Sequence, residues 1–275
     1  MLPSEDLAAI ASQLDAAHAD ARQVEPPSAD FIAFDVESAY AAAALQHRRR
    51  LDEGRRPAGR KLGFTNAAMW ARYGVNAPLW AWLYEDSVSQ LASNQAVCGL
   101  VRFAEPKIEP EIVLGLREAP PPGAADDPGA LLGCVEWVAH GFEVVQCHYP
   151  GWRFEAADAV VDQVLHAALF VGERVPVAAL GADPLAALEG FSVELRCDGE
   201  PRETGHGRNV LGSPLLALAH LLRLLQSQPG AAPLQPGEIV TTGTLTSALP
   251  VALGQRWETR LDGIALPGLA LDFTA

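Results

Sequence analysis

Short strand-like runs broken by glycine and proline fill the sequence from Lys61 to the C-terminus, and only one strong helical pattern interrupts them. The helical pattern spans 214–226, where Pro214 is tolerated because it falls in the first turn. The strand-like runs lie at 108–116, 135–146, 168–171, 192–197, 238–242, 257–261 and 269–273. Many strands with few helices between them predict an α+β fold built from curled, mixed sheets.

Two helical patterns precede this region. The first covers 4–23, where Ser4 can cap the helix, and the second covers 36–53, after a Pro-Pro turn at Pro26 and Pro27. The stretch 54–59 is predicted to be a loop. We therefore expect two parts: an N-terminal helical cap at 1–60 and a catalytic domain of mixed sheets at 61–275.

Charge and apolar patterning exclude several classes of protein. The sequence has 20 Lys+Arg against 34 Asp+Glu, a net charge of −14, which argues against a nucleic-acid partner. The N-terminus has no long apolar run, and the apolar stretch at 215–225 contains His220 and Arg223 and is too short to span a bilayer. The scattered cysteines form no C-x-x-C pair. We expect a soluble cytoplasmic protein with no membrane partner.

The first candidate for chemistry is the pair Glu109 and Glu111. Residues i and i+2 of a strand face the same side, so these two carboxylates would lie side by side on a mostly apolar strand. Such like charges are costly unless a cation neutralises them. Pro110 between them lacks a ladder donor and indicates an edge strand or a bulge. An exposed acidic edge strand is the alternative.

Glu143 is the second candidate, because it is a lone acid in the apolar run GFEVV. An acid in such a run is paired, ligates a metal, or faces water from a half-exposed strand. Together with Glu109 and Glu111 it would make a hard oxygen site suited to Mg²⁺ or Mn²⁺.

Lys61, Asp162 and His166 are candidates for proton transfer. Lys61 stands between small and apolar residues, where burial would lower its pKa toward acid–base use, although a surface lysine is the commoner case. Asp162 and His166 are four apart and could form a proton relay or a simple hydrogen-bonded pair.

A turn at 242–244 is the candidate for binding a carboxylate. Thr242, Gly243 and Thr244 follow a predicted strand and offer backbone N–H groups and hydroxyls, although a Gly-Thr turn is also common without a ligand. The sequence has no phosphate-binding loop, dinucleotide fingerprint or serine-hydrolase elbow.

Short segments in a characteristic order resemble the hydratase/decarboxylase branch of the fumarylacetoacetate hydrolase superfamily. The likeness runs from about Ala39 to the C-terminus. The segments are AY at 39–40, LQ at 45–46, GRKLGFTN at 59–66, YGV at 73–75, IEPE at 108–111, FEVV at 142–145, GWR at 151–153, AD at 157–158, VLGSP at 210–214 and TGT at 242–244.

The resemblance implies a mixed β-roll with a small N-terminal helical region, Mg²⁺ or Mn²⁺ as cofactor, and a homo-oligomer. It also implies that Glu109, Glu111 and Glu143 ligate the metal and that Lys61 is the active-site lysine. The sequence departs from the family pattern at three places where the family would contact substrate. Leu79 occupies the place of an acid, with Trp80 and Trp82 after it as pocket or subunit-interface residues. DQVLHA at 162–167 replaces a Ser/Gly-rich turn, and Gln146 replaces a second acid. The resemblance therefore predicts a bulkier pocket with altered proton donors.

The expected activity is a metal-dependent lyase reaction on a small 2-oxo acid or its dienol in aromatic catabolism, with hydration of a 2-hydroxy-2,4-dienoate first. The metal would act as a Lewis acid on the enolate, Lys61 would move the proton, and Asp162 and His166 would replace the missing acid. A decarboxylase or an acylpyruvate-type C–C hydrolase is the runner-up. A non-catalytic protein that binds 2-oxo acids is the third alternative.

Overall fold

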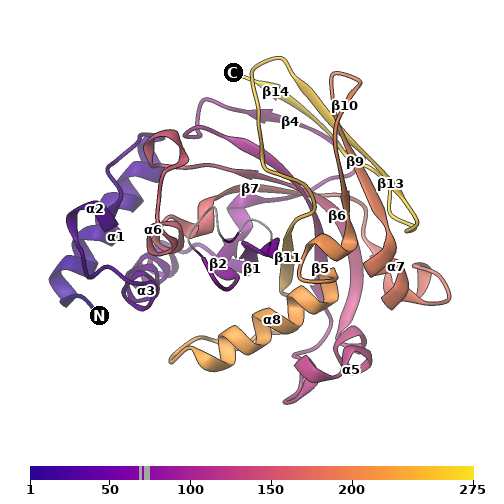
Figure 1. Cartoon of the computed structure of the whole chain (residues 1–275), viewed down its shortest axis with the longest axis horizontal. Helices are drawn as coiled ribbons and strands as arrows, with labels where there is room; N and C mark the ends of the chain where they lie inside the picture. Colours follow the sequence, from indigo (N-terminus) through magenta and orange to yellow (C-terminus); the bar gives the residue numbers. More distant parts are fainter. Residues whose placement is uncertain (68–69, 71–74) are drawn as a thin grey trace.

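The computed structural model describes residues 1–67, 70 and 75–275, so Tyr73 and Gly74 of the YGV segment lie outside the described residues. The larger sheet has the order β2-β1-β11-β5-β6-β7-β3, with β12 paired to β5 and β8 paired to β6 (Figure 1). Its strands are β1 Pro57–Gly63, β2 Leu79–Tyr84, β3 Val88–Gln90, β5 Lys107–Leu116, β6 Val135–Val145, β7 His166–Val171, β8 Val175–Pro176, β11 Ile239–Thr244 and β12 Leu249–Pro250.

The smaller sheet has the order β10-β9-β13-β14-β4. Its strands are β4 Gln95–Gly99, β9 Ser192–Cys197, β10 Glu200–His206, β13 Arg256–Asp262 and β14 Ala270–Thr274. Both sheets mix parallel and antiparallel pairs: β1–β11, β3–β7 and β14–β4 are parallel. The structure therefore confirms the predicted α+β fold with mixed sheets.

Helices flank the sheets. The N-terminal helices lie together at one side of the molecule, and α8 runs below the larger sheet (Figure 1). The helices are α1 Ser4–Asp20, α2 Pro27–Asp30, α3 Val36–Asp52, α5 Pro128–Gly133, α6 Ala156–Val161, α7 Pro184–Gly190 and α8 Pro214–Ser227. Short 3-10 turns are η2 Glu85–Ser87, η3 Ala124–Asp126, η4 Pro150–Trp152, η5 Gln163–Leu165, η6 Val177–Ala179 and η7 Gly207–Asn209.

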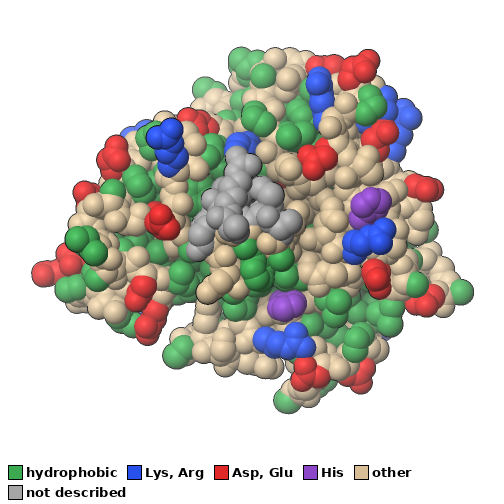
Figure 2. All heavy atoms as spheres, viewed as in Figure 1, with side chains coloured by type: hydrophobic (Ala, Val, Ile, Leu, Met, Phe, Trp, Pro, Cys, Tyr) green, Lys and Arg blue, Asp and Glu red, His purple; other side chains and the backbone are tan. Residues whose placement is uncertain are grey.

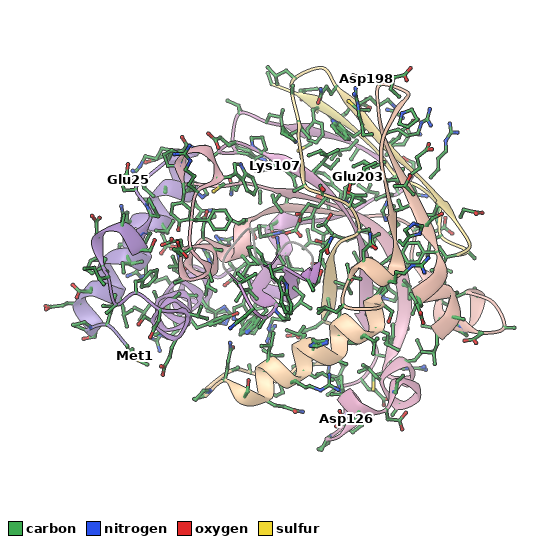
Figure 3. All side chains as sticks on the ribbon, viewed as in Figure 1. Met1, Glu25, Lys107, Asp126, Asp198 and Glu203 are labelled. Atoms are coloured by element: carbon green, nitrogen blue, oxygen red, sulfur yellow. The ribbon has the colours of Figure 1, made fainter. Side chains whose placement is uncertain are left out.

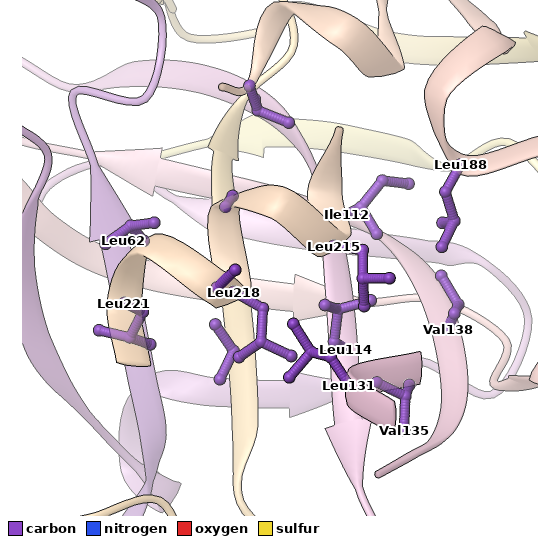
Figure 4. Close-up of a cluster of buried hydrophobic side chains, with 14 of the residues drawn as sticks. Leu62, Ile112, Leu114, Leu131, Val135, Val138, Leu188, Leu215, Leu218 and Leu221 are labelled. Carbon is purple, nitrogen blue, oxygen red and sulfur yellow. The ribbon is translucent and has the colours of Figure 1, made fainter. Parts of the chain in front are cut away.

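The largest hydrophobic cluster lies between α8 and the larger sheet. Leu215 and Leu218 of α8 face Ile112 and Leu114 of β5 (Figure 4). The segment Gly207–Ser227 is long and apolar enough to cross a membrane by length and composition. However, 56% of its apolar 18-residue stretch is buried inside the protein. Its apolar character is therefore explained by core packing, as for the core helix of a globular protein.

Some predicted boundaries differ from the structure. Ser4 is the first helical residue of α1 and not its cap, and the helix ends at Asp20 because Ala21 adopts the left-handed conformation, with φ 48°. The predicted loop at 54–59 is partly strand β1, which begins at Pro57, before the predicted domain boundary at residue 60. The approach of β1 to β11 requires Gly59, since a Cβ there would lie 1.9 Å from the Ile239 carbonyl oxygen. The division into two domains stays a prediction.

Charged groups lie mainly at the surface. Figure 2 shows acidic and basic side chains dispersed over one face of the molecule, among apolar ones. In Figure 3 the side chains of Asp126 and Asp198 lie at its periphery. The buried ionisable groups are therefore exceptions, and four of them, Glu111, His140, Glu143 and His166, lie on β5, β6 and β7.

Candidate metal centre and active site

Glu109, Glu111 and Glu143 lie together on one face of the larger sheet. Glu109 and Glu111 project from β5 to the same side because they are two residues apart, and Glu109 is directly opposite Glu143 of β6. One carboxylate oxygen from each residue lies within 4.8 Å of the others. Glu111 and Glu143 are completely buried, and Glu109 is half-buried.

Pro110 lies in the interior of the sheet and not at an edge. Strand β5 is paired with β11 on one side and with β6 on the other. The irregularity that accommodates Pro110 is in the partner strand, where the register of β11 shifts between Thr241 and Thr244. The sequence therefore indicated a local break in the ladder correctly, but the edge-strand alternative is wrong.

The donor set fits a divalent cation. The Oε1 atom of Glu111 and the Oε2 atom of Glu143 are buried and accept no hydrogen bond from the described residues. Unpaired buried carboxylate oxygens are costly, and metal coordination satisfies them. Three carboxylates with room for water or substrate oxygens form the hard oxygen environment that Mg²⁺ and Mn²⁺ prefer.

The pKa values of Glu109 and Glu111 also support a cation site at the three carboxylates. Burial raises the pKa of Glu109 to about 7, with Lys61 opposing and Glu143 adding to the shift. Burial and the nearby Glu143 also raise the pKa of Glu111 well above its usual value. Both shifts favour the protonated carboxyl groups in the absence of a cation, so metal binding would release protons.

Lys61 is buried against the glutamates. Its Nζ lies 3.0 Å from Oε1 of Glu143, and the lysine side chain is 2% exposed. Burial alone would lower its pKa, but Glu143, Glu109 and Glu111 outweigh burial and raise the pKa. The sequence-based expectation of a lowered lysine pKa is therefore wrong, because it did not include the carboxylates that surround the ammonium group.

His166 contacts the same oxygen. Its Nδ1 lies 2.7 Å from Oε1 of Glu143, and its Nε2 lies 2.9 Å from Oγ of Ser87. Burial tends to raise the pKa of Glu143, but Lys61 and His166 outweigh it and lower that pKa to about 2. His166 therefore acts on the candidate metal centre through Glu143.

Asp162 does not pair with His166, contrary to one prediction. Its Oδ1 lies 2.7 Å from Nδ1 of His148 and 2.8 Å from Nε2 of His18. Asp162 and His166 instead stand at the two ends of the turn η5. Burial opposes ionisation of Asp162, but the hydrogen bonds from His148 and His18 outweigh it and lower the pKa of Asp162.

The turn η5 has an unusual backbone. Gln163, Val164 and Leu165 have φ values of 53°, 49° and 65°, all in the left-handed region. That region costs about 1–2 kcal/mol for each L-residue, and a β-branched valine tolerates it poorly. The surrounding contacts must therefore hold the turn in place.

A small cavity of about 80 Å³ opens beside the glutamates. Lys61 and Glu109 line it together with Gly243 and Thr244. Side chains from several loops line the remainder: Phe64, Thr65, Asn66, Val145, Trp152, Phe154, Val164, Leu165, Thr246, Ser247 and Ala248. Among the described lining residues Lys61 is the only cation, and about half of the lining side chains are apolar or aromatic.

The turn at 242–244 contributes differently from what the sequence suggested. Gly243 donates its backbone N–H to Oε2 of Glu111 at 2.8 Å, and it must be glycine, because a Cβ would lie 1.9 Å from Oγ1 of Thr65. Thr242 is buried and donates its hydroxyl to the Ile112 carbonyl, so it does not line the cavity. The turn thus orients a glutamate, and Gly243 and Thr244 alone reach the cavity.

Leu79 and the two tryptophans lie elsewhere. Leu79 is buried in the hydrophobic cluster that packs the N-terminal helices, so its predicted contact with substrate is not found among the described lining residues. Trp80 and Trp82 line a separate cavity of about 590 Å³ beside α3 and the end of α8. The bulkier pocket expected from these tryptophans is therefore not at the glutamates.

Several residues at the site were not singled out from the sequence. Phe64 and Thr65 line the cavity and directly follow β1, the strand that carries Lys61, so their closeness to the lysine in sequence was a usable signal. Thr246 and Ser247 likewise follow the turn at 242–244. His148 offered no signal, because only the fold brings Asp162 to it.

Comparison with known proteins gives consistent results. No family model matches the chain. The 2-keto-4-pentenoate hydratase 1 of Dechloromonas aromatica (strain RCB) is 31% identical over 258 residues, covering 93% of this chain and 93% of the relative. The structure of 4-oxalocrotonate decarboxylase from Pseudomonas putida G7, complexed with magnesium and adipate, matches with a TM-score of 0.88 and 25% identity over 99% of each chain.

A more distant structure shares the fold. A putative fumarylacetoacetate hydrolase family protein from Yersinia pestis CO92 matches with a TM-score of 0.56 and 14% identity, covering 79% of this chain and 94% of that one. The sequence identity with the hydratase over nearly the full length and the structural match to the decarboxylase are in line with the three-glutamate centre on β5 and β6. The chain therefore belongs to the hydratase/decarboxylase branch of the fumarylacetoacetate hydrolase superfamily.

Proposed function

We propose that this chain is a metal-dependent hydratase that acts on a small 2-hydroxy-2,4-dienoate of the 2-oxopent-4-enoate type. One observation carries the proposal: the carboxylates of Glu109, Glu111 and Glu143 lie close enough together to hold one cation, and they adjoin the buried Lys61, which lines a small cavity together with Glu109. The 31% identity to a 2-keto-4-pentenoate hydratase supports it.

Mg²⁺ or Mn²⁺ would be held by Glu109, Glu111 and Glu143. When bound there, the ion would supply a Lewis acid for the carboxylate and 2-oxygen of the substrate and so stabilise developing enolate charge. The backbone N–H of Gly243 orients Glu111, and His166 and Lys61 orient Glu143. These contacts hold the carboxylates in place before substrate arrives.

Lys61 is the proposed proton carrier. The reaction moves the dienol hydroxyl proton to C5 and then adds water, with its hydroxyl at C4 and a proton at C3. The ammonium group of Lys61 lines the cavity and stays protonated beside Glu143, so it is suited to donate a proton to the substrate carbon chain. His166 reaches the cavity only through Glu143 and is a positioning residue.

Asp162 is not suited to replace the acid that is missing at Leu79. Both histidine contacts and the backbone N–H of His148 point at its carboxylate, and its side chain is completely buried. It is therefore not proposed as a proton donor to substrate.

The charge of the cavity lining favours a monocarboxylate substrate. A second carboxylate would need a second cation or several donors, and Lys61 is the only cation among the described lining residues. The structural match to 4-oxalocrotonate decarboxylase, with a TM-score of 0.88, supports decarboxylation of a dicarboxylate as the second candidate.

The test compares three substrates with the purified chain in Mg²⁺ or Mn²⁺. Hydration of 2-hydroxypenta-2,4-dienoate consumes the dienol absorbance and yields a 4-hydroxy-2-oxo acid, which proton NMR identifies. Release of CO₂ from a 2-oxohex-3-enedioate would favour the decarboxylase, and two fragments from an acylpyruvate would favour the hydrolase. Tight metal-dependent binding without turnover of any substrate would contradict the enzyme proposal and favour a non-catalytic binding protein.

A further inference from the structure

His18, near the end of α1, reaches across to the turn that borders the cavity. Its Nε2 lies 2.8 Å from Oδ1 of Asp162, the residue immediately before the turn. Its Nδ1 lies 3.4 Å from the side-chain amide nitrogen of Gln163, the first residue of the turn, and 3.3 Å from that of Gln146. One imidazole thus links the N-terminal helix to both residues that start the turn.

The group of His18, His148 and Asp162 has the geometry of a hydrogen-bonded cluster. The two histidine nitrogens lie 2.8 and 2.7 Å from the same Asp162 oxygen. Ligands of one tetrahedral zinc ion at about 2.0–2.1 Å would instead lie about 3.3 Å apart. With its proton on Nε2, His18 donates to Asp162, and its Nδ1 accepts from the amide of Gln146, while the Gln163 amide nitrogen lies 3.2 Å from Nε2 and 3.4 Å from Nδ1.

The turn η5 is held at both ends. At its start Asp162 accepts from two histidines and from the backbone N–H of His148. At its end the N–H of Leu165 donates to the Asp162 carbonyl at 2.8 Å, and His166 contacts Glu143. These contacts fix the three residues in a left-handed conformation that they would not adopt unaided.

The side chains of this turn shape the cavity. Val164 and Leu165 both line it. Cγ1 of Val164 lies only 2.5 Å from where a Cβ on Gly63 would be, and the Cε atom of Lys61 lies 3.5 Å from that same position. A change in the turn would therefore move the apolar wall that lies against the lysine.

We propose that His18 is a positioning residue, which holds the left-handed turn Gln163–Leu165 so that Val164 and Leu165 form the wall of the substrate cavity. The inference rests on the proposed function, because it assumes that this cavity takes the dienoate. It assigns to the N-terminal helix a part in substrate binding, although α1 itself contributes no residue to the cavity lining.

The experiment compares His18→Ala, His18→Gln and Leu14→Ala. The glutamine amide can place a donor where Nε2 of His18 lies, so it should restore the contact with Asp162. Leu14 lies one turn earlier on the same helix and is completely buried in the hydrophobic cluster. Its truncation loosens the helix without removing a contact to the turn, and a urea titration shows how much stability each variant loses.

Two readouts are used. Hydrogen exchange measured by mass spectrometry follows the Leu165 amide, and steady-state kinetics with 2-hydroxypenta-2,4-dienoate give KM and kcat. For His18→Ala we expect exchange at 162–166 to rise about tenfold and KM to rise about tenfold, with Mg²⁺ affinity unchanged, since the turn lines the cavity and supplies none of the three candidate metal ligands. His18→Gln should return both quantities toward wild type. Leu14→Ala should not raise exchange at 162–166 more than elsewhere in the chain, and it should leave KM unchanged.

The outcomes separate this inference from the proposed function. If the wild type does not turn over the dienoate, the proposed function fails, while the exchange measurement still decides whether His18 holds the turn. If His18→Ala exchanges at 162–166 no faster than Leu14→Ala, or if KM stays at the wild-type value in an active enzyme, His18 has only a structural role and the inference is wrong.

Discussion

The Nζ atom of Lys61 lies 3.0 Å from Oε1 of Glu143, and Nδ1 of His166 lies 2.7 Å from the same oxygen. Glu143 thus shares one oxygen between a cation and an imidazole, while its other oxygen accepts no hydrogen bond from the described residues and can take a metal. One oxygen of Glu143 therefore binds Lys61 and His166, and the other is available as a metal ligand. This arrangement keeps the lysine close to the metal position without using the oxygen that ligation requires.

Replacing Lys61 should abolish turnover and preserve metal binding. Lys61→Met removes the proton carrier and one positive charge, so kcat is expected to fall about 10²–10⁴-fold, as for loss of a general acid. Mg²⁺ affinity should stay equal or increase, because a competing cation has left the carboxylates. Stopped-flow dienol absorbance and isothermal titration calorimetry measure the two effects. Lys61→Met with wild-type kcat would exclude the assigned role.

Neutralising Glu111 should remove metal binding without unfolding the chain. Glu111→Gln deletes a ligand and puts a neutral amide in place of a carboxyl group whose pKa is raised by burial, so the metal-free protein should be as stable as wild type, while Mg²⁺ binding and turnover disappear. Glu136→Gln is the matched control, since Glu136 is exposed on β6, the strand that carries Glu143. Calorimetric metal titration and urea unfolding test both statements. Mg²⁺ affinity that survives the substitution would contradict the assigned site.

Metal affinity should weaken as the pH falls below about 7. In the metal-free protein burial raises the pKa of Glu109 to about 7 and that of Glu111 above its usual value, so both carboxylates bind protons that the metal must displace. For each displaced proton the Mg²⁺ affinity should decrease about tenfold per pH unit below the relevant pKa. Titrations at pH 8, 7 and 6 in buffers of different ionisation enthalpy measure affinity and proton release together. A pH-independent affinity would show that the carboxylates are already ionised.

Buried His140 should make the fold sensitive to mild acid. Burial lowers its pKa to about 4, so the folded chain keeps it neutral while the unfolded chain binds a proton below about pH 6.5. The unfolded state therefore gains protons between about pH 6.5 and 4, and stability falls by about 1.4 kcal/mol per pH unit across that window. His140→Gln should remove this component, seen as a shallower decline of the urea unfolding free energy from pH 7 to 5. Parallel curves for the two proteins would contradict the assignment.

The sequence by itself determined the class of architecture and the placement of Glu109 and Glu111 on one face of a strand. Strand periodicity placed Glu109 and Glu111 on the same side, and the cost of burying like charges indicated a cation, because both follow from local geometry and electrostatics. The family segments then identified Glu143 and Lys61 as their partners. The cytoplasmic location and the homo-oligomer stay predictions.

Tertiary structure decided how the remaining polar residues are used. Asp162 and His166 are near each other in sequence, yet the left-handed turn between them directs one to His18 and the other to Glu143. The direction of the pKa shift of Lys61 likewise depended on carboxylates from β5 and β6. Contacts between residues far apart in the sequence leave no periodic pattern in it, so only the packed fold shows which partner each buried group has.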